Sequence, residues 1–241
     1  MMEASFIPRT LRRNKLEKSI YFKSKAFYKY SGLIPKAWKT NYTTRGKRVI
    51  LIHNPKAAGT SLKNLLSDIN HTSHSMPSNV CSEKNWINSF SICAIRDPFE
   101  RFISGYIFMT KSKFQGVLYR KYGEKLFDLN PFTFLEFIKQ YPEKLGPQVN
   151  WVSHYSKVKP RCDLILRTEE SHKWIKQLKS HGIETLSSQL YNLNSTSNNV
   201  KKSKLASSLT KKEITMLRHR VWDYYKTDYE LFGYQKNCDL N

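Results

Sequence analysis

The sequence predicts an α/β fold with a central, mostly parallel sheet, and three observations point to it. The chain has 241 residues, of which 39% are hydrophobic, and this suffices for one large domain with a buried core. Two apolar runs, at residues 48–53 and 90–95, are typical of strands that are buried on both faces. A stretch with helical spacing follows each run, and strands that alternate with helices favour a parallel sheet.

The first predicted strand covers residues 48–53 and ends at Asn54-Pro55, because proline interrupts a strand. After Gly59 a helix is expected to begin at Thr60-Ser61. Its apolar residues recur on one side at helical spacing: Leu62, Leu65, Leu66 and Ile69. A polar connector at residues 71–84 then leads to the second strand.

The second strand, at residues 90–95, ends at Arg96-Asp97-Pro98, and a helix follows with Phe99, Phe102, Ile103 and Tyr106 at helical spacing. Two more helices are predicted at residues 132–141 and 169–181, with a short strand at 163–166 between them. Thr210 and Glu213 fit a capping box at the start of the last helix. Residues 192–208 are polar and are expected to form a surface loop.

The N-terminal 47 residues are rich in lysine, arginine and aromatic residues and show only weak periodicity. We expect helical turns around residues 16–30 within a basic extension that packs on a domain of residues 48–241. The alternative is a segment that contacts a polyanion or, peripherally, a membrane surface.

The chain carries 41 lysines and arginines against 19 aspartates and glutamates, a formal net charge of +22. Such a charge indicates an anionic partner: nucleic acid, anionic lipid, an acidic polysaccharide or a polyphosphorylated nucleotide. The four cysteines are widely spaced without a CxxC pair, which predicts no metal site and favours a reducing compartment. No apolar stretch approaches a membrane span or a signal peptide, so we expect a cytoplasmic protein, or a fragment of a membrane-anchored Golgi one.

Residues 54–61, which we call the phosphate loop, connect the first predicted strand to the helix after it. A strand, a short loop that contains glycine and a helix N-terminus recur as an anion-binding arrangement in proteins. The first N–H groups of a helix lack helical partners and, with the helix dipole, favour an anion. Lys56 adds a cation, and Thr60 and Ser61 add hydroxyl donors. A phosphate-loop ATPase would instead place its lysine directly before the serine or threonine. A capped strand-to-helix turn with an incidental lysine is the competing interpretation.

Arg96 lies where the second strand ends, and Ser104 lies two helical turns further on. Neighbouring parallel strands end at the same sheet edge, so Arg96 is expected beside the phosphate loop. A guanidinium binds phosphate in a planar, bidentate manner, which suits a second phosphate group. An ion pair between Arg96 and Asp97 or Glu100 is the alternative.

Residues 52–62 and 94–106 resemble two motifs of the carbohydrate sulfotransferases, commonly written HxPKTAGTS and RDPxxRxxSxY. Residues 163–169, 193–195 and 225–234 also resemble stretches of this family. The sequence departs from the first motif at Ala57-Ala58, where threonine followed by alanine or glycine is usual; one possible hydroxyl contact is thereby lost.

The resemblance implies a P-loop-like three-layer α/β fold and transfer of a sulfuryl group from 3′-phosphoadenosine 5′-phosphosulfate (PAPS) to a hydroxyl, usually on a sugar, without a metal. Lys56 would stabilise charge on the bridging oxygen, and Arg96 and Ser104 would hold the 3′-phosphate. The 5′-phosphosulfate would lie against the loop residues Pro55, Lys56, Ala57, Ala58, Gly59, Thr60 and Ser61.

The acceptor hydroxyl needs a base, and histidine titrates near working pH. In related polysaccharide sulfotransferases a histidine between the two motifs has this role, and the connector here contains His71 and His74. We favour His74 for its spacing to the second motif. The other candidates are His53, His154 and Glu83.

Two other classes of function compete with this interpretation. A nucleotide kinase or NTPase would need a lysine beside the loop threonine and an aspartate for Mg²⁺. A nucleic-acid-binding protein would need stacking platforms or a recognition helix among the lysines, and no such module is evident, so no specific nucleic-acid partner is expected. The positive charge favours an acidic carbohydrate acceptor, a polysaccharide or glycolipid.

Overall fold

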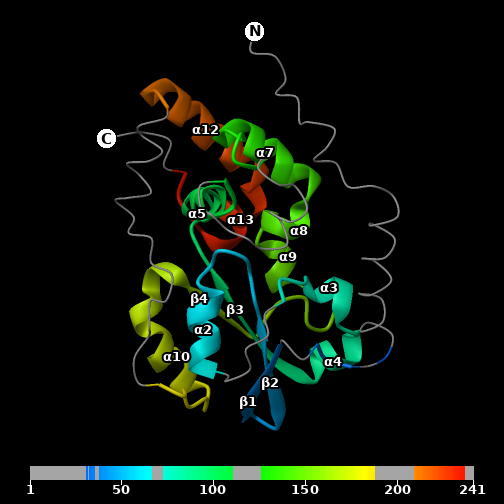
Figure 1. Cartoon of the computed structure of the whole chain (residues 1–241). Helices are drawn as coiled ribbons and strands as arrows, with labels where there is room; N and C mark the ends of the chain where they lie inside the picture. The colour runs from blue at the N-terminus through cyan, green and yellow to red at the C-terminus, as the bar shows by residue number, and fades with distance from the viewer. Residues whose placement is uncertain are drawn as a thin grey trace. The chain divides into compact units, whose positions relative to one another are not determined.

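A computed structural model describes residues 31, 33–35, 38–66, 73–110, 126–187 and 209–236 (Figure 1). They divide into two compact units. We call residues 31–96 and 148–187 the sheet unit, and residues 97–147 and 209–236 the helical unit. The predicted α/β class, with a mostly parallel central sheet flanked by helices, is confirmed.

Four strands form the sheet in the order β1 (Lys39–Thr44), β2 (Lys47–Ile52), β3 (Ser89–Ile95) and β4 (Leu164–Arg167). β2, β3 and β4 are parallel, whereas β1 pairs with β2 in an antiparallel hairpin. The three parallel strands match the predicted ones within one residue.

β1 was not predicted. Arg45 and Gly46, both with positive φ (49° and 71°), form the tight turn that joins it to β2. Its sequence is polar and every second residue is exposed, as in an edge strand. β1 lies inside the segment assigned to the N-terminal extension, and the domain boundary before residue 48 stays a prediction.

Helices cover the sheet on both faces (Figure 1). α2 (Gly59–Leu66) and α10 (Trp174–Ser180) pack on one face. Their shared core consists of buried residues from β2, β3 and β4 and from both helices: Val49, Leu51, Leu62, Leu65, Leu66, Phe90, Ile92, Ala94, Leu166, Trp174, Leu178 and Ile183. The helix predicted at 169–181 begins as a 3₁₀ helix, η4 (Thr168–Lys173), and continues as α10.

Three short helices lie on the other side of the sheet in Figure 1: α3 (Pro77–Val80), α4 (Glu83–Ile87) and α9 (Val149–Val152). α3 lies within the stretch 71–84 that was predicted as a polar connector, and α4 begins at its end. Each is too short for its apolar residues to repeat at helical spacing, so the pattern gave no helical signal.

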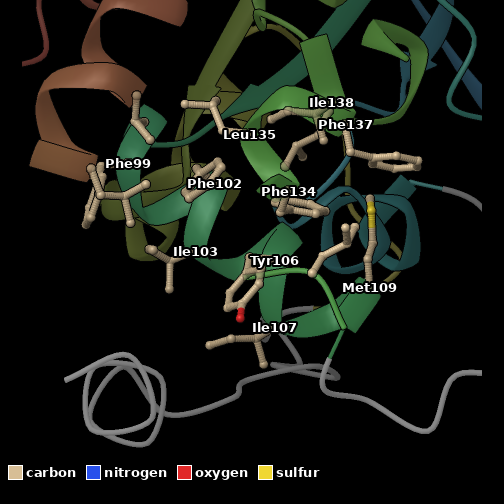
Figure 2. Close-up of a cluster of buried hydrophobic side chains, with 14 of the residues drawn as sticks. Phe99, Phe102, Ile103, Tyr106, Ile107, Met109, Phe134, Leu135, Phe137 and Ile138 are labelled. Carbon is tan, nitrogen blue, oxygen red and sulfur yellow. The ribbon is translucent and has the colours of Figure 1, made fainter. Parts of the chain in front are cut away.

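The helical unit contains α5 (Pro98–Thr110), α7 (Pro131–Gln140), α8 (Pro142–Leu145), α12 (Lys211–Tyr224) and α13 (Lys226–Phe232). Its core is aromatic, and Figure 2 shows the rings that α5 and α7 contribute. The ring centroid of Phe134 lies 5.6 Å from that of Phe102 and 5.5 Å from that of Tyr106.

Two charged side chains, Arg101 and Asp228, are fully buried in the described part of the helical unit. Arg101 donates to the carbonyl of Gly146 (2.9 Å). Its guanidinium lies 5.9 Å from the ring centroid of Tyr225. The capping box predicted at the start of α12 is confirmed, because Thr210 and Glu213 each bond to the other's backbone N–H. The segments predicted at residues 16–30 and 192–208 lie outside the described residues, as do Ile69 and residues 193–195.

Candidate phosphate-binding site

The candidate site lies at the carboxyl edge of the parallel strands. Ile52 pairs with Cys93, and Ile95 pairs with Arg167, so β2 and β3 end within a few residues of each other. The chain continues from these ends into His53 and Arg96. Ligands of open α/β sheets bind beyond this edge, as the sequence predicted for this site.

The phosphate loop has a left-handed backbone at two residues that are not glycine. φ is 63° at Lys56 and 54° at Ala58, whereas Ala57 between them has a negative φ. Side-chain-bearing residues adopt this conformation at a cost of about 1–2 kcal/mol, and such strain gathers at functional sites. Alternating handedness turns successive N–H groups towards one side, where they form a concave anion-binding surface.

The loop runs directly into the first turn of α2. The first helical hydrogen bond is donated by the N–H of Leu62 to the carbonyl of Ala58 (3.1 Å), so the N–H groups of Gly59, Thr60 and Ser61 have no partner within the helix. The first turn contains no acidic residue. Lys63, one turn along, is buried, and burial lowers its pKa. The N–H groups at this helix N-terminus, with no acidic residue beside them, favour a bound anion.

His53 occupies the space behind the loop. A Cβ built on Gly59 would overlap its imidazole ring, which explains why glycine stands at this position. Only 7% of His53 is exposed, and its Nδ1 has no hydrogen-bond partner among the described residues. Burial, followed by the charges of His74, Lys63 and Lys56, lowers the pKa of His53 to about 3, so its ring is neutral at physiological pH.

The structure brings His74 to this site as well. Its ring meets that of His53 edge-on, with 4.5 Å between the centroids. The side chain is solvent-exposed, while its backbone carbonyl accepts a hydrogen bond from the indole of Trp151 (3.0 Å). His71, the other histidine predicted in the connector, lies outside the described residues.

Asn54 and Arg96 are joined by Gln148, a residue that the sequence analysis missed. The Oε1 of Gln148 accepts from the Nδ2 of Asn54 (3.0 Å) and from the N–H of Arg96 (2.9 Å). Its Nε2 donates to the carbonyl of Arg96 (2.7 Å). The three residues therefore link the start of the phosphate loop to the end of β3. A lone glutamine before a short helix carries no sequence signal for this role.

The other predicted base candidates in the sheet unit lie in different surroundings. The Nδ1 of His154 accepts from the N–H of Ser156 (3.1 Å), and its Nε2 is 3.1 Å from the carbonyl of Cys81. Its ring stacks on Trp86, with 5.1 Å between the centroids. Both nitrogens of His154 therefore serve the fold. Glu83 lies in the first turn of α4 and is half-buried.

Ser104 belongs to the helical unit, where it lies in the middle of α5 and is 7% exposed.

Among the described residues, no group of three histidine, cysteine, aspartate or glutamate side chains is arranged to hold a metal ion. A search of the same residues found no helix with the length and apolar character needed to cross a membrane.

The site consists of a strand, a partly left-handed loop and a helix N-terminus at the edge of a parallel sheet, an arrangement with which many α/β proteins bind phosphate groups. The model of the sulfotransferase family matches residues 39–235, which is most of the chain. The protein belongs to this family and is therefore a transferase enzyme. No curated protein and no solved structure matches the chain.

Proposed function

We propose that this sulfotransferase takes the sulfuryl group from PAPS and transfers it to a hydroxyl of a carbohydrate. The observation that supports the donor best is the phosphate loop with its left-handed Lys56 and Ala58, joined through Gln148 to Arg96. This arrangement supplies two places for anionic groups, one at the loop and one at the end of β3. PAPS carries two such groups, a 5′-phosphosulfate and a 3′-phosphate.

In this proposal, residues 55–61 bind the 5′-phosphosulfate through backbone N–H groups and the hydroxyls of Thr60 and Ser61. Lys56 stabilises negative charge on the bridging oxygen as the nucleotide leaves. Arg96 binds the 3′-phosphate, for which a guanidinium is well suited. The assignment of Ser104 to the same phosphate rests on its place in the sequence motif.

An ATP-hydrolysing or ATP-transferring enzyme is the less favoured function. In an ATPase loop the lysine stands in the first turn of the helix, next to the serine or threonine that binds Mg²⁺. Here α2 begins with Gly59-Thr60-Ser61, and Lys56 precedes the helix on the left-handed part of the loop. The lysine therefore approaches a bound phosphate from a different direction.

We propose His74 as the general base. Its ring is exposed to solvent, and its edge contact with His53 holds it near the phosphate loop. His53 itself is a poor base, because its pKa of about 3 lies far below working pH. His154 has both ring nitrogens engaged with backbone groups.

In the proposed step, His74 removes the proton of the acceptor hydroxyl while the acceptor oxygen attacks sulfur. The bond between sulfur and the bridging oxygen breaks, and the electron pair stays with the 5′-phosphate, near Lys56. The products are a sulfate ester and adenosine 3′,5′-bisphosphate. As in phosphoryl transfer, positioning and charge stabilisation supply most of the rate enhancement.

The net charge of +22 supports an acidic carbohydrate as acceptor, such as a polysaccharide or a glycolipid. We also propose that the basic N-terminal segment contacts an anionic membrane surface. The acceptor proposal rests on charge and on the family, whereas the membrane proposal rests on charge alone. Neither needs a specific nucleic-acid partner.

The proposal is tested by transfer of labelled sulfate from PAPS to a panel of desulfated polysaccharides and glycolipids. Removing a group that stabilises transition-state charge costs on the order of 10²–10³-fold in kcat, so we expect a loss of this size in Lys56→Ala. His74→Ala should lose transfer but bind adenosine 3′,5′-bisphosphate with nearly unchanged affinity.

His172→Ala is the matched control, because it removes another exposed histidine of the sheet unit and should leave turnover unchanged. Retained turnover in His74→Ala would remove His74 from the mechanism. Absence of transfer to every acceptor of the panel would contradict the carbohydrate assignment.

A further inference from the structure

Gln148 is a fully buried amide that contacts both parts of the candidate site. It precedes α9 and lies beside the ends of β2 and β3, where it bonds to Asn54 and to Arg96. We propose that Gln148 is a positioning residue that fixes Arg96 relative to the phosphate loop and thereby sets the preference for a donor with a 3′-phosphate. This inference rests on the proposed function and adds a determinant of donor specificity to it.

The contact with Arg96 is made to its backbone on both sides. The carboxamide of Gln148 accepts from the N–H of Arg96 and donates to its C=O (2.9 and 2.7 Å). This is the pairing that a neighbouring strand would make with that residue. The glutamine therefore extends the hydrogen bonding of β3 by one residue and holds Arg96 in a defined backbone conformation, so its side chain starts from a fixed point.

The contact with the phosphate loop is made through Asn54, which is 1% exposed. Its Nδ2 donates both to the Oε1 of Gln148 (3.0 Å) and to the carbonyl of Ala94 in β3 (2.9 Å). A flipped amide would turn Oδ1 towards two acceptors, so the network determines the orientation of Asn54. The loop and β3 are thus joined by the same set of bonds.

A donor that carries both a 5′-phosphosulfate and a 3′-phosphate binds tightly only when the spacing between the phosphate loop and Arg96 matches the spacing of its two anionic groups. Binding energy from the second phosphate is realised only when Arg96 lies in register with the loop, and small misplacements are costly. Three hydrogen bonds from one buried side chain keep this register. A side chain of similar size without polar atoms would fill the space and leave the register unsupported.

The experiment measures the affinities of adenosine 3′,5′-bisphosphate and of adenosine 5′-phosphate by titration calorimetry, for the wild type and for Gln148→Met. The ratio of the two affinities reports the contribution of the 3′-phosphate. We expect this ratio to fall about tenfold in Gln148→Met, since a charge-assisted contact is lost or misplaced. In an Arg96→Ala background the Gln148 substitution should leave the remaining ratio unchanged, because the two residues act as a unit.

Gln148→Asn is the second variant: it keeps an amide, shortened by one methylene, and should also lower the ratio. If both variants bound the two nucleotides more weakly by the same factor, the ratio of affinities would be preserved. That result would overturn the inference, because it is expected when Gln148 has a purely structural role. A wild type that does not prefer the bisphosphate would contradict the proposed function itself, which separates the two failures.

Discussion

The two units of the molecule bury different chemistry. In the sheet unit, buried polar side chains gather around the phosphate loop: His53, Asn54, Ser61, Lys63 and Gln148. The core of the helical unit is built from aromatic and aliphatic side chains, many of them on α5 and α7. Burying a polar group lowers stability unless hydrogen bonds compensate for it. Fewer described residues of the helical unit are buried and polar, namely Arg101, Ser104, Thr110 and Asp228. The donor site that we propose therefore lies mainly in the sheet unit, and the aromatic core of the helical unit serves as a scaffold.

Backbone strain follows the same division. Among the described residues of the sheet unit, Lys56 and Ala58 have a positive φ within the phosphate loop itself. In the described part of the helical unit the left-handed position is Gly233, which ends α13 and adopts this conformation without strain. Arg45, in the turn between β1 and β2, is the third non-glycine residue with a positive φ in the described part of the sheet unit. The sheet unit therefore gives up stability locally, at the phosphate loop and at this turn, and packing elsewhere compensates for it.

The largest loss of folding stability is expected from a substitution in the helical unit. Phe134 is fully buried between α5 and α7, and Phe134→Ala should lower the free energy of unfolding by about 3–5 kcal/mol. Denaturant unfolding measures this loss, and Phe132→Ala, which removes a half-buried ring of the same helix, should cost less. A substantial change in the affinity of the folded variant for adenosine 3′,5′-bisphosphate would break the division between scaffold and site.

Gly59→Ala should lower the free energy of unfolding by a smaller amount. The new methyl group overlaps the ring of His53 and overpacks the loop. Overpacking of this kind costs about 1–3 kcal/mol, and displacement of the loop should also weaken nucleotide binding. The additional change His53→Ala makes room for the methyl group. The double variant should therefore bind the nucleotide more tightly than Gly59→Ala alone, and independent, additive effects would refute the proposed contact.

His53 also predicts a dependence of stability on pH. Its pKa is lowered from 6.5 to about 3 on folding, so the unfolded chain takes up a proton from about pH 6.5 downwards and the folded protein does not. Stability is therefore complete above pH 6.5 and decreases as the pH falls, by about 2 kcal/mol at pH 5 from this residue. Unfolding measured at pH 8 and pH 5 should show a smaller difference in His53→Gln, and an unchanged difference would contradict a buried neutral ring.

Most of the fold was predictable because the parallel strands contain short apolar runs and the helices α2, α5, α7 and α12 have apolar residues at helical spacing. β1 was missed, since an edge strand with polar residues on both faces shows no such period. The phosphate loop was located from its residue types. Its left-handed conformation at Lys56 and Ala58 was not predictable, because neither residue favours positive φ.

The parts of the site that sequence reasoning missed depend on tertiary contacts. Gln148 is far from Asn54 and Arg96 along the chain, and glutamine alone does not indicate a bond to either. The low pKa of His53 arises from burial and from the charges around it, which no local pattern reveals. The low pKa of His53 argues against His53 as the base, and the role of His74 stays a prediction.

The most direct test of the central claim is the thermal stability of the protein with adenosine 3′,5′-bisphosphate and, separately, with ATP and Mg²⁺. A ligand at a hundred times its Kd stabilises the folded state by about 2.7 kcal/mol, which gives a clear rise in Tm. We predict this rise with the bisphosphate and little or none with ATP and Mg²⁺. Stabilisation by ATP and Mg²⁺ without any effect of the bisphosphate would contradict a PAPS site at the phosphate loop.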